Sequence, residues 1–347
     1  MIEKIIAKLV AQKNLSFKET EQVFGQIFDQ KLFPAQIAAF LTALKIKGET
    51  EEEISAAATV VRKRAKKIKI YNSFLGIEDE YQEVLDTCGT GGSGVNKFNI
   101  STAVAFVVAA AGIKVAKHGN KAMSSGCGSA DVLEHLGIKI DASAKVMEKA
   151  INEVGIGFLY APLYHPALGN VAKIRKQLKI RTIFNILGPL SNPAFANFQL
   201  LGVYSPDLVL PMAKVLKQLG LKRALVVFGK DLKDEISLTG PTKVCFLSNG
   251  KIKKMNLVPK DFGLKKIKAK DIESSDPKKS AKIIKDVLAG KKGATRDIVL
   301  ANAAACFYLL KKVKDFKAGV AKAASVIDDK KASDLLEKFK GFLDKNA

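Results

Sequence analysis

The sequence contains no long apolar run, which bears on where the protein resides. The longest such run in its 347 residues, Ala103 to Ile113, spans about eleven residues, whereas a transmembrane helix needs roughly 20. The first residues are amphipathic, with acidic Glu3 near the start, and they include no small-residue cleavage site. We therefore expect no membrane association, a cytoplasmic location and a buried helix over 103–113.

Cysteine is also scarce. The four cysteines, Cys88, Cys127, Cys245 and Cys306, have neither CxxC spacing nor the density of a secreted disulfide scaffold. We expect them to be reduced and mostly structural.

Arginine is scarce although the chain is strongly basic. Only six of the 57 basic residues are arginine, and the net charge is +23. The lysines are spread through nearly every segment and do not form one stripe with interleaved aromatic residues, a texture typical of a solvated surface. Nucleic acid is therefore disfavoured as a partner. The same surface would attract small, highly anionic substrates by electrostatic steering.

The apolar content of 48% suffices for a substantial interior, and the chain exceeds the size at which a single core usually stops growing. Two unequal domains are therefore expected. Over residues 1 to about 70, apolar residues recur at helical spacing without β alternation. Ser16 with Glu19 suggests a capping box, and acids fill the segment from Thr50 to Glu53, as at a helix start. The sequence predicts a helical domain over 1–72 and a second domain over 73–347.

From about residue 80 the pattern changes to alternating strands and helices. The expected strands are 83–88, 113–117, 156–160, 200–204, 224–228 and 244–247. The expected helices between them are 101–111, 142–153 and 206–219, with further helices from Pro277 onward. This alternation predicts the α/β class, with a mainly parallel central sheet flanked by helices and the carboxyl ends of its strands along one edge.

A glycine-rich segment follows the first of these strands. It reads Asp86-Thr-Cys-Gly-Thr-Gly-Gly-Ser-Gly94. Glycines permit positive φ, consecutive amides can form an anion-binding nest, and the helix that follows adds a partial positive charge. The same composition suits a tight connection between strand and helix, so this segment alone leaves both interpretations open.

Three polar segments come next along the chain. Asn99-Ile-Ser-Thr102 precedes the apolar helix, where one hydroxyl can serve as a cap, and its three polar side chains are better explained if some of them face phosphate or metal. Lys117-His-Gly-Asn-Lys121 follows a strand and places two ammonium groups, an imidazole and an amide together. Ser124 and Ser125 precede a short helix, another entrance suited to an anion, for which Ser129 is the expected N-cap.

An acidic pair, Asp234 and Glu235, follows a later strand. Magnesium prefers carboxylate, water and phosphate oxygens. For two adjacent acids taken alone, a solvated surface loop is the better interpretation.

The succession of these segments resembles the anthranilate phosphoribosyltransferase family. The matching blocks are GTGG at 89–92, NIST at 99–102, KHGN at 117–120 and GSADVLEHLG at 128–137. Later blocks agree in order, namely His165-Pro-Ala167, Arg175, Arg181 to Leu190 with Asn192-Pro193, Asp234 to Ser237 and Gly240 to Thr242. The resemblance covers nearly the whole chain, and within the matched block it favours metal for the acidic pair.

The resemblance implies a homodimer with a small helical domain, which we expect helices within 165–190 to complete, and a larger α/β domain. It implies that the phosphoribosyl group of phosphoribosyl pyrophosphate (PRPP) is transferred to the amine of anthranilate, giving N-(5-phosphoribosyl)anthranilate and pyrophosphate in tryptophan biosynthesis. The cofactor would be Mg²⁺, and PRPP would lie in the cleft between the domains.

The resemblance also implies roles for individual residues. Those expected at PRPP are Gly89, Gly92, Ser93, Lys97, Asn99, Ile100, Ser101, Thr102, Lys117, Ser124, Ser125 and Ser129. Gly89, Asn120 and Arg175 would contact anthranilate, and Ser101, Asp234 and Glu235 would serve Mg²⁺. The catalytic candidates are Lys117 and His118.

The chemistry suggests what the two catalytic candidates do. Loss of pyrophosphate builds negative charge on the leaving group, which magnesium, Lys117 and loop amides would stabilise. The aromatic amine is uncharged at pH 7, so positioning suffices without a strong base. We therefore expect His118 to position the substrate.

Three residues depart from the family pattern: Ser93 replaces a usual Asp, Lys97 a usual Thr and Lys121 a usual Arg. With Lys97, the segment TGG-x-G-x-x-K resembles the phosphate loop of pyrimidine nucleoside phosphorylases. We hypothesise that Lys97 contacts a PRPP phosphate, so that Lys97→Thr would raise the KM for PRPP.

Three alternatives remain: a nucleoside phosphorylase, a basic nucleic-acid-binding homologue and a homologue without catalysis. Arg175 and Asn120 argue against the first. The KHGN block, Arg175 and the acidic pair argue against the other two.

Overall fold

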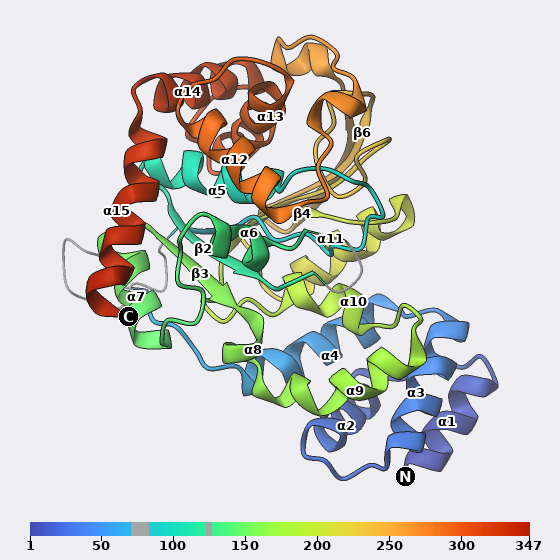
Figure 1. Ribbon diagram of the computed structural model, residues 1–347. Coiled ribbons are helices and arrows are strands. Elements are labelled where there is room, and N and C mark those ends of the chain that lie inside the picture. The colour runs from blue at the N-terminus through green and yellow to red at the C-terminus, as the bar shows by residue number, and fades with distance from the viewer. Residues whose placement is uncertain (71–82, 123–126) are drawn as a thin grey trace.

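The computed structural model describes residues 1–70, 83–122 and 127–347, and the chain forms a helical bundle and an α/β part (Figure 1). The expected fold class is confirmed. Among the described residues, no helix is both long enough and apolar enough to cross a bilayer.

The N-terminal bundle contains the four helices α1 (Ile2–Val10), α2 (Phe17–Phe28), α3 (Pro34–Lys47) and α4 (Glu51–Arg64). The predicted capping box at Ser16 and the predicted helix start at Thr50 to Glu53 are both confirmed. Ser16 and Glu19 form a capping box at the start of α2, and Thr50 and Glu53 form another at α4. These boxes satisfy amides that would otherwise lack partners at the helix N-termini.

Two later helices lie against this bundle, α9 (Gly169–Leu178) and α10 (Phe184–Leu187), whereas the short α8 (Ala161–Tyr164) before them packs on the end of the sheet. Helix α9 packs on α2 and α3, and α10 packs on α4. Phe184 is buried with the bundle core, with its ring centroid 5.8 Å from that of Phe24. The ribbon in Figure 1 shows α9 lying beside the bundle, with α10 at its junction with the α/β part.

A seven-stranded sheet in the order β3-β2-β1-β4-β5-β6-β7 forms the centre of the α/β part. Its strands are β1 (Val84–Asp86), β2 (Lys114–Gly119), β3 (Ile156–Tyr160), β4 (Phe198–Gly202), β5 (Arg223–Gly229), β6 (Thr242–Ser248) and β7 (Lys251–Leu257). The first five in spatial order run parallel to one another, β6 runs antiparallel to β5, and β7 runs antiparallel to β6. The six expected strands and the mainly parallel sheet are confirmed, and β7 is an addition.

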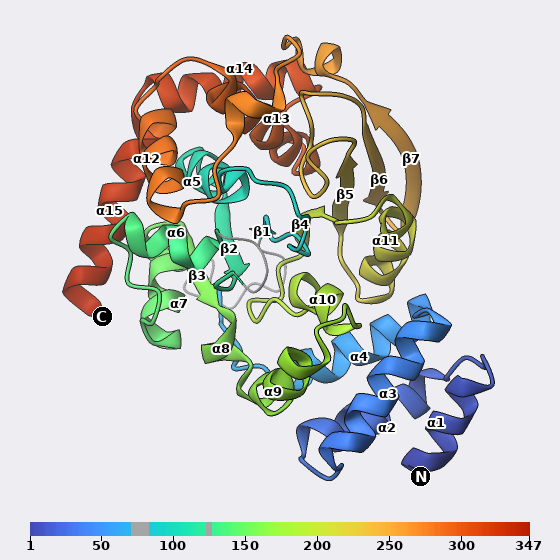
Figure 2. The same cartoon turned by 45° about the vertical axis from the view of Figure 1, so that its right-hand side comes forward.

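Helices cover the sheet. These are α5 (Ile100–Ala110), α6 (Ser129–His135), α7 (Ala144–Glu153), α11 (Val209–Gln218), α12 (Pro277–Leu288), α13 (Ala294–Leu309), α14 (Phe316–Asp328) and α15 (Lys331–Asn346). Helix α5 is buried nearly all round, as expected from its apolar run, and packs on α12, α13 and α15. Figure 2 shows α12 to α15 gathered around α5, away from the helical bundle.

The parallel strands end along one edge of the sheet. There β1 leads into the glycine segment, β2 ends at Gly119, β4 ends at Gly202, and β5 leads through a short turn to Asp234. In open parallel sheets, ligands bind beyond the carboxyl ends of the strands. The predicted site residues are therefore brought to this edge from distant parts of the sequence.

Candidate active site

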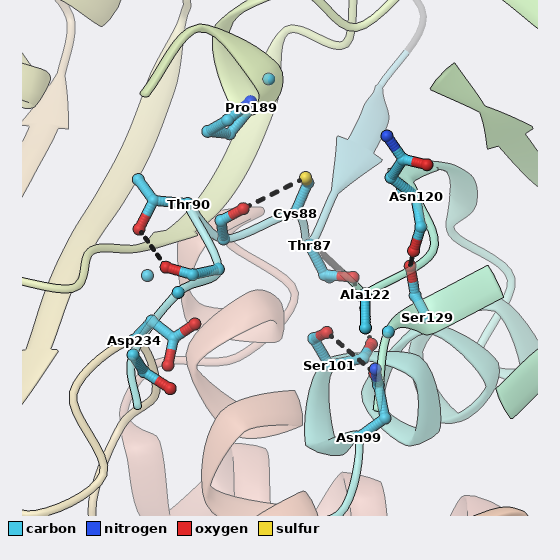
Figure 3. Close-up of a pocket in the computed structure, with 18 of the residues that line it drawn as sticks. Thr87, Cys88, Thr90, Asn99, Ser101, Asn120, Ala122, Ser129, Pro189 and Asp234 are labelled. Carbon is cyan, nitrogen blue, oxygen red and sulfur yellow. Dashed lines mark hydrogen bonds between the residues drawn. The ribbon is translucent and has the colours of Figure 1, made fainter. Parts of the chain in front are cut away.

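A cavity of about 310 Å³ lies at this edge, and residues of both parts of the chain line it. The predicted site residues that line it are Gly89, Gly92, Ser93, Lys97, Asn99, Ile100, Ser101, Lys117, His118, Asn120, Ser129, Arg175, Asp234 and Glu235. In Figure 3, Asp234 lies on one side of this space, while Ser101, Asn120 and Ser129 lie on the other. Ser124 and Ser125 lie outside the described residues.

The glycine segment is held open by positive-φ residues. Gly91 and Gly92 have φ of 63° and 64°, in a region of backbone conformation that residues other than glycine rarely adopt. Thr90 N donates to Gly202 O at 2.9 Å, which anchors the segment to β4. Arg181 Nη2 donates to Gly92 O at 2.6 Å, and the Arg181 guanidinium lies 4.2 Å from the ring centroid of Tyr204. Arg181 belongs to a family block for which the sequence indicated no role, and the structure connects it to this loop.

The N-terminus of α5 is capped by Asn99, not by a hydroxyl. Asn99 Oδ1 accepts from Thr102 N at 3.2 Å and from Thr102 Oγ1 at 2.7 Å. Thr102 is buried by this cap and does not line the cavity. Ser101 does line the cavity; its Oγ donates to Asn99 Oδ1 at 3.4 Å and accepts from Lys117 Nζ at 3.1 Å.

Two further contacts form at the start of α6, which also borders the cavity. Ser129 is the first residue of α6 and Gly128 is its N-cap, so the expected N-cap at Ser129 is wrong. The cap falls one residue earlier because Asp131 reaches back and accepts from Gly128 N at 3.0 Å. Ser129 Oγ instead donates to Asn120 O at 3.4 Å.

Lys117 forms part of the cavity base. Its side chain ends beside Ser101 Oγ, to which Nζ donates at 3.1 Å, and Nζ makes longer contacts of 3.4 Å with the carbonyl and hydroxyl of Thr87. The residue is 4% exposed. A buried ammonium whose direct hydrogen-bond partners are all neutral oxygens is well placed to attract an anion.

His118 follows Lys117 directly, and one of its two ring nitrogens, Nε2, carries no proton. Its Nδ1 lies 2.9 Å from Gly188 O, and because a carbonyl only accepts, Nδ1 carries the proton. Nε2 is buried, has no hydrogen-bond partner within the described part of the chain, and is thus an acceptor. Burial, reinforced by neighbouring His165, lowers the pKa of His118 to about 3. The ring is neutral at physiological pH and a weak base, in line with the positioning role expected from the chemistry.

A buried carboxylate supports the backbone beneath this segment. Asp86 accepts from His118 N at 3.2 Å and from Asn192 Nδ2 at 2.8 Å. Burial raises the pKa of Asp86 to about 6. Asp86 belongs to the glycine segment and Asn192 to a family block, and the sequence indicated no role for either. Their signal was a polar residue beside apolar neighbours, which indicates burial but not the partner.

Asp234 and Glu235 supply the acidic wall. A Cβ at Gly202 would overlap the backbone of Asp234, so glycine allows this close approach. Glu235 is 8% exposed, and burial, with the charge of Asp234 as a further cause, raises its pKa to about 7. Two carboxylates and the Ser101 hydroxyl are an oxygen donor set that fits Mg²⁺, which commonly takes one or two carboxylates together with substrate phosphates and water.

Lys97 extends into this acidic wall. Its Nζ lies 2.6 Å from Asp234 Oδ1 and 3.3 Å from Ser93 Oγ. Two of the three departures from the family pattern, Ser93 and Lys97, are therefore in contact with each other.

Arg175 and Asn120 approach the cavity from different elements. Arg175 belongs to α9, and its guanidinium lies 5.4 Å from the ring centroid of Phe184. Burial lowers its pKa, but a guanidinium stays charged. Asn120 follows β2 and is exposed. A planar cation and an amide therefore stand beside the anion-binding elements.

The sequence was compared with known families and proteins. The glycosyl transferase family, a/b domain, matches residues 81–333, and the family's helical bundle domain matches residues 3–65. The anthranilate phosphoribosyltransferase of Geobacter sp. (strain M21) is 48% identical over 343 residues, 97% of each chain. That of Desulfosudis oleivorans is 46% identical over 100% of each chain.

Solved structures agree with the sequence comparisons. Anthranilate phosphoribosyltransferase from Thermus thermophilus superposes with a TM-score of 0.90 at 37% identity, covering 98% of this chain and 99% of that one. The Saccharomyces cerevisiae enzyme in complex with PRPP and Mg gives 0.89 at 30% identity, covering 99% and 98%. This chain therefore belongs to the anthranilate phosphoribosyltransferase family.

Proposed function

We propose that this protein transfers the phosphoribosyl group of PRPP to the amine of anthranilate, releasing pyrophosphate, as a step of tryptophan biosynthesis. One observation carries the proposal. A single cavity combines a glycine loop and helix N-terminus, a buried ammonium, an acidic pair and an arginine. These are the partners required by a polyphosphate, a divalent cation and an aromatic carboxylate. The yeast relative, whose structure contains PRPP and Mg, supports the same assignment.

The PRPP phosphates would lie between the glycine segment and the start of α5. The glycine segment and the N-terminal turn of α5 border this space, where amides of the segment other than that of Thr90, together with the helix dipole, would favour an anion. Asn99, Ser101, Ser129 and Lys117 add side-chain donors. Ser124, Ser125 and Thr102 remain predicted PRPP contacts, and Ile100 would contribute its backbone.

Ser101, Asp234 and Glu235 would hold Mg²⁺. When bound, the ion would offset the charge that develops on the pyrophosphate leaving group. The chain's own contribution is Lys117, which is fixed before substrate arrives and so needs no reorganisation as charge develops.

Anthranilate would bind where Asn120, Arg175 and Gly89 face the cavity. Arg175 would pair with the carboxylate through its planar fork of N–H groups. The unprotonated Nε2 of His118 would accept an N–H of the amine and direct its lone pair at C1 of the ribose. As the C–N bond forms and the C–O bond to pyrophosphate breaks, the nitrogen loses one proton to solvent or a phosphate oxygen. With a pKa of about 3, His118 is too weakly basic to keep that proton.

We also propose a cytoplasmic homodimer. Several large apolar side chains are exposed on the bundle, including Val10 at 67%, Phe33 at 76% and Ile46 at 73%. Burial of such residues in a subunit interface would stabilise the assembly. The domain boundary near residue 72, with helices of 165–190 completing the smaller domain, also remains our proposal.

The direct test is to mix the purified protein with PRPP, Mg²⁺ and anthranilate and to follow the loss of anthranilate fluorescence. We expect loss that requires both PRPP and Mg²⁺, with stoichiometric pyrophosphate release. An intact protein that leaves anthranilate unchanged would contradict the proposal. Phosphorolysis of a pyrimidine nucleoside by the same preparation would then identify the phosphorylase alternative.

A further inference from the structure

The cavity contains a sheltered ionic contact between Lys97 and Asp234. The ammonium and carboxylate are 2.6 Å apart, and their side chains are only 10% and 12% exposed. The two residues come from different segments, the glycine loop and the turn after β5, separated by 137 positions. A charge pair this sheltered is screened far less than a surface pair.

This contact occupies an oxygen that the cofactor would need. Asp234 Oδ1 accepts from Lys97, and the ammonium stands where a cation would approach that oxygen. A metal ion and an ammonium cannot share one side of a carboxylate, because their positive charges repel each other at contact distance. Metal binding that uses Oδ1 of Asp234 therefore requires Lys97 to leave.

We propose that Lys97 is an exchangeable counter-ion of Asp234, which excludes free divalent metal until an anionic substrate takes up the ammonium. The proposal deepens the function proposed above and rests on it for the identity of metal and substrate. Lys97 belongs to the same loop as the phosphate-binding amides, so phosphate provides a new partner within reach of its side chain. Metal at Asp234 and phosphate at Lys97 then favour each other.

The coupling is reciprocal by linkage: an anion that strengthens metal binding is itself bound more strongly when metal is present. The ion would consequently enter together with its polyphosphate substrate. Lys97 would act as a positioning residue, and the earlier hypothesis that it contacts phosphate describes the second of its two states.

The first test is a titration of the full-length protein with Mn²⁺ alone, following free Mn²⁺ by electron paramagnetic resonance. Lys97→Met keeps the aliphatic stem and removes the charge. Because a hydrogen bond to a charged group is lost when metal displaces the lysine, we expect the variant to bind Mn²⁺ about ten- to a hundredfold more tightly than the wild type. Lys97→Arg should stay near the wild-type affinity. Lys97→Gln makes the same test if the Met variant does not fold.

A matched control separates this contact from general charge. Lys121 also lines the cavity, but its Nζ pairs with Glu134 at 3.0 Å. Lys121→Met removes the same charge and should change Mn²⁺ affinity by less than about threefold, as expected for an exposed pair. Adding Asp234→Asn to Lys97→Met should abolish the gain.

The second test adds sulfate as an anionic probe that does not chelate Mn²⁺ strongly, with chloride at matched ionic strength as the reference. Sulfate should tighten Mn²⁺ binding to the wild type and have no such effect on Lys97→Met. Equal Mn²⁺ affinity of wild type and Lys97→Met, or an equal sulfate effect on both, would overturn the proposal. No anthranilate or PRPP is present, so these outcomes are independent of whether the proposed transfer reaction occurs.

Discussion

The ammonium of Lys47 lies 2.9 Å from Oε2 of Glu53 inside the helical bundle, where the two side chains are 3% and 0% exposed. Glu53 also accepts from Leu15 N and Thr50 N, each at 2.8 Å. This single carboxylate thus joins the segment before α2, the end of α3 and the start of α4. Removing one partner of a buried pair leaves the other charge buried and uncompensated. The loss of stability then exceeds the stabilisation that the pair itself contributes.

Glu53→Ala should therefore lower the free energy of unfolding by about 3 to 5 kcal/mol. Urea denaturation monitored by circular dichroism measures this loss. Glu21→Ala, which removes the partner of the exposed Lys63, should cost less than about 1 kcal/mol. Similar costs for the two variants would show that the buried network is not a special stabilising feature.

Lys117→Met should lower kcat by about 10² to 10³, because it removes one preorganised donor to the developing anion. The KM for PRPP should change less than kcat, since the contact strengthens as the leaving group acquires charge. Steady-state kinetics with saturating Mg²⁺ measure both, and Lys117→Arg should recover part of the rate. A rise in KM at unchanged kcat would mean that Lys117 only binds the ground state.

His165 provides a prediction for pH. Burial lowers its pKa to about 4, whereas an unfolded histidine titrates near a pKa of about 6.5. Between these values the unfolded chain binds more protons than the native one, so stability falls as pH decreases from about 6.5 to about 4. His165→Phe removes this dependence.

As pH decreases across this range, the wild type should therefore lose free energy of unfolding relative to His165→Phe, by up to about 1.4 kcal/mol per pH unit. Asp86 acts in the opposite direction. Because the pKa of Asp86 is raised to about 6 in the folded protein, Asp86 contributes its full stabilisation at pH values below the pKa of an unfolded Asp. This stabilisation is lost as pH rises through about 6. That contribution is present in both proteins and cancels in the comparison. Parallel pH profiles would contradict the assignment of a buried neutral imidazole.

The residues that carry the family blocks were recognisable through the resemblance of those blocks to a family, and most of them meet in one cavity. The features that the sequence did not indicate depend on contacts between residues far apart in the chain. Arg181 reaches Gly92 from 89 positions away, and no local pattern specifies such a partner. Strand β7 was missed because exposed lysines such as Lys253 and Lys254 replace the apolar alternation. The Asn249-Gly250 turn before it, with both residues at positive φ, was the available signal.

The same limit applies to the cap of α5. Asn, Ser and Thr are all good N-caps, so the segment Asn99 to Thr102 offered several candidates. Only the backbone direction, which places Asn99 in the cap position, left Ser101 facing Lys117.

Arg181→Met should loosen the glycine segment. It removes the bond to Gly92 O and the contact with the Tyr204 ring, and because Arg181 is exposed we expect a loss of about 1 kcal/mol, or roughly fivefold in the KM for PRPP. Tyr204→Phe keeps the ring and should keep most of the effect of the arginine. If the KM for anthranilate changed while that for PRPP did not, the loop-holding role would be wrong.

Arg175 distinguishes the two substrates. Arg175→Met should raise the KM for anthranilate by about 10² or more, because a charge-assisted bidentate pair is lost, while the KM for PRPP stays within about threefold. Arg175→Lys retains the charge without the planar fork, so it should recover the anthranilate KM only in part. Methyl anthranilate, which lacks the carboxylate, should be an equally poor substrate for the wild type and for Arg175→Met. A wild type that still prefers anthranilate while Arg175→Met loses PRPP affinity would place this guanidinium at phosphate, and the acceptor would then have to be held by other residues of the cavity.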